Sequence, residues 1–491
     1  MTAATIDAPV GLLARGSASA PLAWLRERGM GASILVAAIS TAFGVLLISA
    51  TGYIAAMLSA DPYIGASGVL GFVNGVLTVL LLGVAVYVAS IVTANTFATV
   101  VAGRTRRIAL LRLIGASARS QRSEIGQQGL IVGVIGASGG LVGGTALAAG
   151  GVWLAGRMLA AGEVPFDLVR IELLIPATIV ALTTWAAAWA GSRRVLTVTP
   201  LEALGGSVES SHGAMGRRSA RNITALVLGV VGAALLALGI LAGLVSPLGV
   251  VIAFLGGILS FTGLALGAAW VMPPVLRLVG RLFGGSATAR LAAENALRYP
   301  ERSSRMAIGV VMGVALVTMF AVAMESAKAV MTAAAGGELP VELTTALDSF
   351  AAIMVGLVAV SAVIAGVGLV NLLTIGVVQR RRELGLLRAL GVSNRQIRRM
   401  VLLEAAHITI AATTTGLVLG VLYGWAGAQS LLGSIPLDPS ATVAVGTFVW
   451  PAVPPWPVAA IVAATALLTM VAAVIPTRLA TRVAPVEALA E

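Results

Sequence analysis

The sequence predicts an all-α polytopic membrane protein with about ten transmembrane helices arranged 4+2+4, in which the two groups of four are parallel repeats. Three observations predict this fold. The 491-residue chain is 58% hydrophobic and 11% charged, with a mean hydropathy of +1.00, and a soluble domain of this size cannot bury so much apolar surface. Long apolar runs recur along the chain, and two stretches of sequence match each other at a constant spacing.

A membrane-crossing helix needs roughly 20 mainly apolar residues, because the hydrocarbon core of a bilayer is about 30 Å thick. The runs that meet this requirement are 32–59, 67–101, 126–155, 171–191, 222–244, 247–274, 305–325, 347–378, 399–432 and 456–476. Glycines recur in the third run, which predicts close helix packing, with a moving hinge as the alternative. These glycines are Gly133, Gly136, Gly139, Gly140, Gly143 and Gly144.

The basic residues predict the orientation. With both termini in the cytoplasm, all of the 32 Lys and Arg residues except Arg157, Arg170 and Lys328 fall in cytoplasmic segments, as the positive-inside rule requires. The net charge of +12 therefore does not indicate a nucleic-acid partner. Arg greatly outnumbers Lys, which is typical of a GC-rich bacterial genome, so we expect a bacterial cytoplasmic membrane. The chain has no cysteine, which leaves its redox compartment open.

Residues 95–119 match residues 371–395 at a spacing of 276 residues. The identical pairs are Asn95/Asn371, Val101/Val377, Arg104/Arg380, Arg106/Arg382, Leu110/Leu386, Leu111/Leu387, Arg112/Arg388, Gly115/Gly391, Ser117/Ser393 and Arg119/Arg395. A second match, 200–204 with 485–489, ends each half. Both copies run in the same direction, so the repeat is parallel. We expect a first half at 1–205, a linker with two spans at 206–285, and a second half at 286–491.

Residues 378–404 predict a basic helix that leaves the membrane, ends at Gly391 and restarts after an N-cap at Ser393. Its leucines, Leu384, Leu387 and Leu390, predict an exposed apolar face between arginines, which suits docking of another protein. A solvated positive-inside loop is the alternative, and the two copies in register favour docking. The candidate docking residues are Arg104, Arg106, Leu110, Leu111, Arg112, Gly115, Arg380, Arg382, Glu383, Leu384, Leu387, Arg388, Leu390 and Gly391.

The motif Asn-x(8)-Arg-x-Arg-Glu-x-Gly-Leu-Leu-Arg-Ala-Leu-Gly-Val-Ser, followed by Glu404 and ended by Pro-x-Glu-Ala-Leu, resembles the FtsX-like permease family of ABC transporters, the MacB-like class. The resemblance implies a permease subunit that exports or extracts a lipid, a drug or an antimicrobial peptide. It implies a separate cytoplasmic ABC ATPase, in two copies per chain, which binds the ATP and Mg and docks on the loop between the second and third spans of each half. Residues 290–305 resemble the family's surface helix.

The first half departs from this motif. Arg107 replaces Glu383, and Gln128 replaces Glu404, so the resemblance implies unequal docking at the two halves. The family's large extracytoplasmic domain is also missing. No P-loop is present, so we expect no enzymatic activity and no cofactor in this chain. His212 and His407 offer no metal-ligand spacing.

Two other functions stay open. One is a mechanotransmitting module that signals the state of the ATPase to an extracytoplasmic partner. The other is a secondary transporter, which the parallel repeat and the scarcity of ionisable residues in the spans disfavour. Asn95 and Asn371 lie in the second spans, where we expect a packing hydrogen bond, with a pivot between the halves as the alternative.

The uncharged spans favour a substrate that partitions into the bilayer. We expect it to enter a crevice between the halves that is lined by 32–59, 67–101, 305–325 and 347–378. Acidic residues near the outer mouth favour a cationic amphiphile, and a solvated loop is the alternative. These residues are Glu325, Glu338, Glu342 and Asp348.

Overall fold

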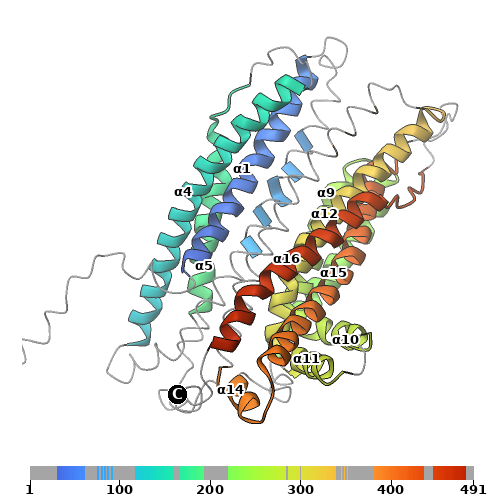
Figure 1. The fold of residues 1–491 in the computed structure, drawn as a ribbon. Helices are drawn as coiled ribbons and strands as arrows, with labels where there is room; N and C mark the ends of the chain where they lie inside the picture. Colours follow the sequence, from blue (N-terminus) through green and yellow to red (C-terminus); the bar gives the residue numbers. More distant parts are fainter. Residues whose placement is uncertain are drawn as a thin grey trace, which may run out of the picture.

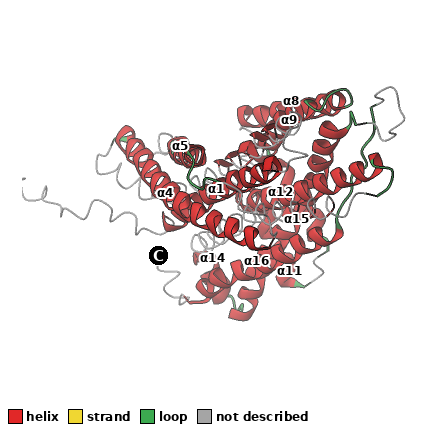
Figure 2. Cartoon of the chain, turned by 90° about the horizontal axis from the view of Figure 1, so that it is seen from above, coloured by secondary structure: helices red, strands yellow, loops and turns green. Residues whose placement is uncertain are grey.

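The computed structural model describes residues 30–60, the short runs 75–76, 79–80, 82–84, 86–87 and 90–91, then 117–158, 166–192, 219–282, 286–298, 300–338, residues 344, 348 and 351, 381–435 and 446–482. Every regular element in these ranges is a helix (Figure 2). The helices are α1 (Met30–Ala60), α4 (Ala118–Met158), the 3-10 turn η3 (Ile171–Leu173), α5 (Leu174–Gly191), α8 (Ser219–Gly243), α9 (Gly249–Leu266), α10 (Ala268–Gly280), α11 (Ala287–Arg298), α12 (Pro300–Ala334), α14 (Arg381–Ala389), α15 (Asn394–Leu432) and α16 (Pro455–Arg482). The predicted all-α fold class is confirmed.

Seven of the described helices are long and apolar enough to cross a bilayer, namely α1, α4, α5, α8, α9, α12 and α15. A shorter apolar stretch, Pro455–Val471, begins α16. Each of these lies where the sequence predicts a span, and the chain is a membrane protein. The second spans, at 67–101 and 347–378, lie outside the described residues apart from single positions. The count of ten and the boundaries of the two halves therefore stay predictions.

The sixth predicted span, 247–274, is two helices and not one. α9 ends at Leu266 and α10 begins at Ala268, because Gly267 at the junction leaves helical geometry, with φ −88° and ψ 4°. Pro273 and Pro274 then remove two N–H donors from α10. Only α9 crosses the membrane, and α10 lies beside α11 at the α14 end of the bundle (Figure 1).

The helices form two groups. α1, α4 and α5 pack together, and α12, α15 and α16 pack together, with the described residues of 75–91 drawn between the groups (Figure 1). Viewed from above, α8 and α9 lie on one side of α12 and α15, and α16 lies on the other (Figure 2). The largest apolar core surrounds α12 and contains Phe43 of α1, Val311 of α12 and Ile408 of α15. This shared core joins the two groups.

The two groups use equivalent glycine contacts. Gly140 and Gly144 of α4 pack against α1, and Gly416 and Gly420 of α15 pack against α12. A Cβ atom on Gly416 would lie 2.8 Å from Cβ of Val314, closer than side-chain packing permits. Gly140 and Gly416 are 276 residues apart, and so are Gly144 and Gly420. The sequence repeat found at the end of the second spans therefore continues into the third spans.

Close packing is confirmed for four of the six predicted glycines of α4. Gly133 packs against α5, and Gly136, Gly140 and Gly144 pack against α1. Close packing was wrong for Gly139 and Gly143, where an added Cβ would meet no described atom within 4 Å. α4 thus has one glycine face toward its neighbours and another that is exposed.

Candidate functional site

A sharp corner joins α14 to α15. Gly391 has φ +94°, and its N–H donates to the carbonyl of Arg388 at 3.0 Å, while the N–H of Val392 donates to the carbonyl of Leu387 at 3.0 Å. This pair of hydrogen bonds is a Schellman ending, in which glycine supplies the left-handed residue. The predicted helix end at Gly391 is confirmed. We call α14, the turn 390–393 and the first two turns of α15 the α14 corner.

The restart of the chain as α15 is also confirmed. The Oγ atom of Ser393 accepts from the N–H of Gln396 at 3.3 Å, and the Gln396 side chain accepts from the N–H of Ser393 at 2.9 Å. This reciprocal arrangement is a capping box. In the first half, Ser117 accepts from the N–H of Ser120 at 3.1 Å at the start of α4, so the cap is kept there while serine replaces glutamine.

The prediction of an exposed face formed by Leu384, Leu387 and Leu390 was wrong for two of its members. Leu384 is 6% exposed and packs against Ala292 of α11 and the start of α15, and Leu387 is half-buried against the same cluster. Only Leu390, at 73%, is strongly exposed, and Leu386 joins it on the surface. Leu384 and Leu387 are covered because α11, about ninety residues earlier in the chain, lies on that side of α14.

The outer surface of the α14 corner combines these leucines with charge. Glu383, Arg395, Arg398 and Arg399 are exposed, and Arg388 is half-buried. Exposed leucines surrounded by arginine and a carboxylate are chemically suited to a protein interface. Arg382 lies in α14, but its side chain is outside the described residues.

The other predicted docking and pivot positions lie outside the described residues. They are Arg104, Arg106, Leu110, Leu111, Arg112 and Gly115 of the first half, Arg380 of the second half, and Asn95 and Asn371 of the two second spans. Their roles stay predictions.

Hydrogen bonds connect the start of α12 to α11 and α10, the helices beside the α14 corner. Ser303 of α12 donates to the carbonyl of Ala296 in α11 at 2.6 Å, and Ser304 donates to the carbonyl of Ala268 in α10 at 3.0 Å. Since α11 also packs against Leu384, one contiguous set of contacts runs from α14 through α11 to the start of α12.

The predicted outer-mouth acids are partly compensated by a cation. Lys328 bonds to Asp348 and lies 3.8 Å from Glu325. Both Glu325 and Lys328 belong to α12, which continues to Ala334, so the helix extends nine residues beyond the predicted span 305–325 and both residues lie on it. Glu338 is exposed, and Glu342 lies outside the described residues.

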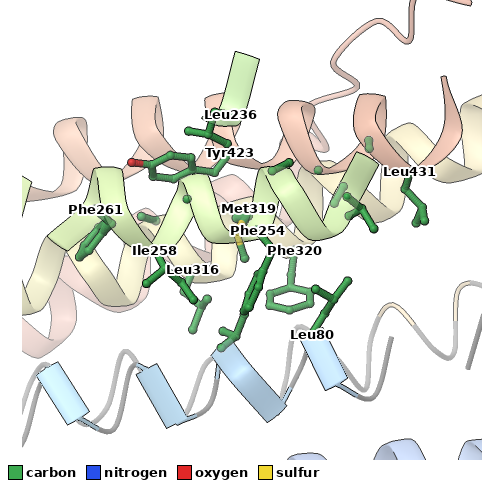
Figure 3. Close-up of a pocket in the computed structure, with 18 of the residues that line it drawn as sticks. Leu80, Leu236, Phe254, Ile258, Phe261, Leu316, Met319, Phe320, Tyr423 and Leu431 are labelled. Atoms are coloured by element: carbon green, nitrogen blue, oxygen red, sulfur yellow. The ribbon is translucent and has the colours of Figure 1, made fainter. Parts of the chain in front are cut away.

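An elongated apolar cavity of about 240 Å³ lies among α9, α12, α15 and the segment 80–87 (Figure 3). Its described lining comes from α9, α12, α15, the segment 80–87 and Leu236 of α8. α1 does not line this cavity, whereas α9 and α15 do, so the predicted crevice along 32–59 is a different space and stays a prediction. The remaining predicted wall, 347–378, lies outside the described residues.

Two tyrosines contribute the hydroxyl groups of the cavity wall. Tyr87 donates to the carbonyl of Ile258 at 3.1 Å and lies 2.8 Å from Oγ1 of Thr262, and the hydroxyl of Tyr423 lies 2.9 Å from Oγ of Ser260. Both hydroxyls therefore bond to α9, one from the segment 80–87 and the other from α15. The sequence reasoning missed these residues, although a tyrosine within an apolar span is a usable signal because its hydroxyl needs a partner there.

Phe254 of α9 projects toward the segment 80–87 (Figure 3). A Cβ atom on Gly83 would lie 2.7 Å from Cζ of Phe254, so only glycine leaves room for the ring at this position. Leu80 and Val84 line the cavity on either side of Gly83. At this point of the wall, the aromatic ring of Phe254 packs directly against the backbone of Gly83.

No charged side chain lines the described wall of the cavity, and no group of three or more His, Asp or Glu side chains in the described ranges is arranged to hold a metal ion. The arrangement can therefore bind an apolar group.

Comparison with known proteins identifies the family. The model of the FtsX-like permease C-terminal domain matches residues 79–200 and 355–485, which together are just over half of the chain and correspond to the two predicted repeats. Both matched regions include a candidate docking segment.

Curated relatives match over shorter stretches. The macrolide export ATP-binding/permease protein MacB of a Shewanella species is 29% identical over 150 residues, 30% of this chain and 21% of the relative. The ABC transporter permease YtrF of Bacillus subtilis is 40% identical over 73 residues, 14% of this chain and 16% of the relative. The chain thus spans about a fifth or less of the length of these relatives. The two-region match nevertheless establishes that the chain belongs to the FtsX-like permease family.

Proposed function

We propose that this chain is the permease subunit of an ABC transporter, which couples ATP hydrolysis by a separate cytoplasmic ATPase to the export or extraction of a hydrophobic or amphiphilic substrate. The observation that carries the proposal is the α14 corner, which presents Leu386 and Leu390 beside exposed charges on a rigid, doubly capped turn. Family membership supports it, and so does the name of YtrF, an ABC transporter permease.

Movement of a docked ATPase has a physical route into the membrane. Leu384 packs on α11, and α11 is joined to α12 through Ser303. A displacement of α14 is expected to move α11 and the start of α12 together, because packed interiors do not deform continuously. We place the α14 end in the cytoplasm of a bacterial cell, with both termini on that side and two ATPase copies per chain.

The same route favours one alternative function. A contiguous set of contacts from α14 to α12, a helix that continues to the ion pairs of Lys328 at its other end, suits a module that signals the state of an ATPase across the membrane. Transport is the stronger proposal because the chain also contains the apolar cavity among α9, α12 and α15.

The docking proposal is tested by reconstituting the chain in liposomes with each ABC ATPase of the same organism. The chain alone should hydrolyse no ATP. The charge reversal Glu383→Arg and the substitution Leu390→Asp should each abolish stimulation by a bilayer-partitioning substrate while leaving the permease folded. Glu294→Arg, an exposed glutamate of α11 at the same end of the bundle, is the matched control. Equal loss in the control would contradict docking at the α14 corner.

The two halves are expected to differ. Because Arg107 stands where Glu383 stands in the second half, Arg107→Glu should reduce coupling less than Glu383→Arg does. The substrate class is tested in the same liposomes, where cationic amphiphiles are compared with sugars and amino acids. Stimulation by the hydrophilic solutes alone would overturn the proposed substrate class.

A further inference from the structure

The cavity lined by α9, α12, α15 and the segment 80–87 is long and narrow. Its lining follows α12 from Met312 to Ala327, about 22 Å at 1.5 Å per residue, and α9 from Val250 to Phe261, about 17 Å. Its volume of about 240 Å³ is below the roughly 300–1,000 Å³ of sites for drug-sized ligands. A bulky ring system does not suit such a space, whereas a flexible chain does.

The described wall selects against polar groups. The hydroxyls of Tyr87 and Tyr423 are already bonded to α9, and the other lining side chains are aliphatic, aromatic or thioether groups, or glycine. A charged or strongly polar group placed here would lose its hydration without compensation. The ligand portion that enters is therefore hydrocarbon.

The position of the cavity indicates where this hydrocarbon comes from. α9, α12 and α15 are membrane-crossing helices, so the surrounding medium is the acyl region of the bilayer. At one end of the cavity, the lining residue Ala327 is adjacent in sequence to Lys328, which pairs with Glu325 and Asp348. Polar groups thus begin where the apolar wall ends, as they do along a lipid molecule.

We propose that this cavity binds one hydrocarbon chain of a membrane lipid, which lies along α9 and α12 with its headgroup at the Lys328 end and outside the cavity. The site recognises the chain and not the headgroup. Binding is a property of this chain alone and needs no ATPase, so the proposal goes beyond the transport function and can be tested apart from it.

Two glycines allow the cavity to be filled without disturbing its wall. Gly257 of α9 and Gly427 of α15 both line it, and an added Cβ at either position would meet no described atom within 4 Å. Gly257→Leu and Gly427→Leu should therefore occupy the space that a lipid chain uses. Gly139→Leu is the matched control, because Gly139 is an exposed glycine of α4, away from the cavity, with equally open surroundings.

The experiment uses the full chain in liposomes that contain a phosphatidylcholine with a diazirine midway along one acyl chain. After illumination, labelled residues are located by mass spectrometry, and labelling of α9, α12 and α15 is divided by that of the exposed face of α4. The wild type and Gly139→Leu should show strong cavity labelling. Gly257→Leu combined with Gly427→Leu should reduce it about tenfold, while gel filtration and the thermal unfolding midpoint stay unchanged.

Equal labelling of the filled variant and the wild type would overturn the proposal, since only lipid at the protein surface would then be reported. A second arm uses phosphatidylglycerol with the same labelled chain. Equal labelling by the two lipids is expected, and labelling confined to one headgroup would overturn chain recognition. Should the ATPase assays fail while cavity labelling persists, the transport function alone is refuted.

Discussion

The carbonyl oxygen of Leu276 in α10 lies 2.6 Å from Nε2 of His407, a buried residue in α15. This contact joins the short helix that follows the linking spans to the longest described helix of the second half. It gives His407, one of the two histidines of the chain, a structural role.

His407→Phe removes this hydrogen bond and keeps a ring of similar shape. A buried hydrogen bond contributes about 1 kcal/mol, so the thermal unfolding midpoint of the purified protein should fall measurably. Thr414→Val is the control, because Thr414 is exposed and bonds only within its own helix, to Ile410. Equal effects of the two substitutions would show that the contact between α10 and α15 is not stabilising.

Gly391→Val should disrupt the α14 corner, since a β-branched residue at φ +94° is strained by about 1–2 kcal/mol. Stimulation of ATPase activity is expected to fall, while the unfolding midpoint of the membrane-crossing helices changes little. Gly391→Asn should retain most of the stimulation, because asparagine tolerates left-handed backbone. If valine and asparagine perform alike, the shape of the corner is not what the ATPase requires.

Gly416→Leu should separate α15 from α12 and lower stability by several kcal/mol, as overpacking against backbone does. Gly140→Leu should have the same effect on α4 and α1. Folded yield after detergent extraction is the measurement, and Gly139→Leu should match the wild type. A harmless Gly416→Leu would contradict the close packing of α12 and α15.

The cysteine-free sequence permits single-cysteine mapping of the topology. In intact cells an impermeant maleimide should label Ala335→Cys and Ser440→Cys, and should not label Ser210→Cys or Gly285→Cys. The reason is the confinement of basic residues to the segments that we expect in the cytoplasm. Labelling of the second pair would reverse the orientation.

Local features were predictable from the sequence. Gly391 and Ser393 form the helix end and the cap because both depend on a few neighbouring residues. The burial of Leu384 was not predictable, since it depends on Ala292 of a helix distant in sequence. A short amphipathic helix shows which residues share a face, and it does not show which face a distant helix will cover.

The cavity was even less accessible to sequence reasoning. Apolar periodicity identifies spans, but in a membrane all faces of a helix are apolar, so the pattern does not show which spans adjoin. The place of α9 between Tyr87 and Tyr423 follows only from packing. The break at Gly267 was hidden for the same reason, because α9 and α10 together form one hydrophobic run.

Lys328 is the only lysine in the sequence, and it lies next to Ala327, which lines the cavity. An amine-selective fluorophore would therefore attach at one internal position, at the Lys328 end of the site. The emission of a dye on Lys328 would respond to local polarity. It would therefore report whether the cavity is occupied, with no change to the sequence. The sequence has no other lysine side chain that would compete for such a dye.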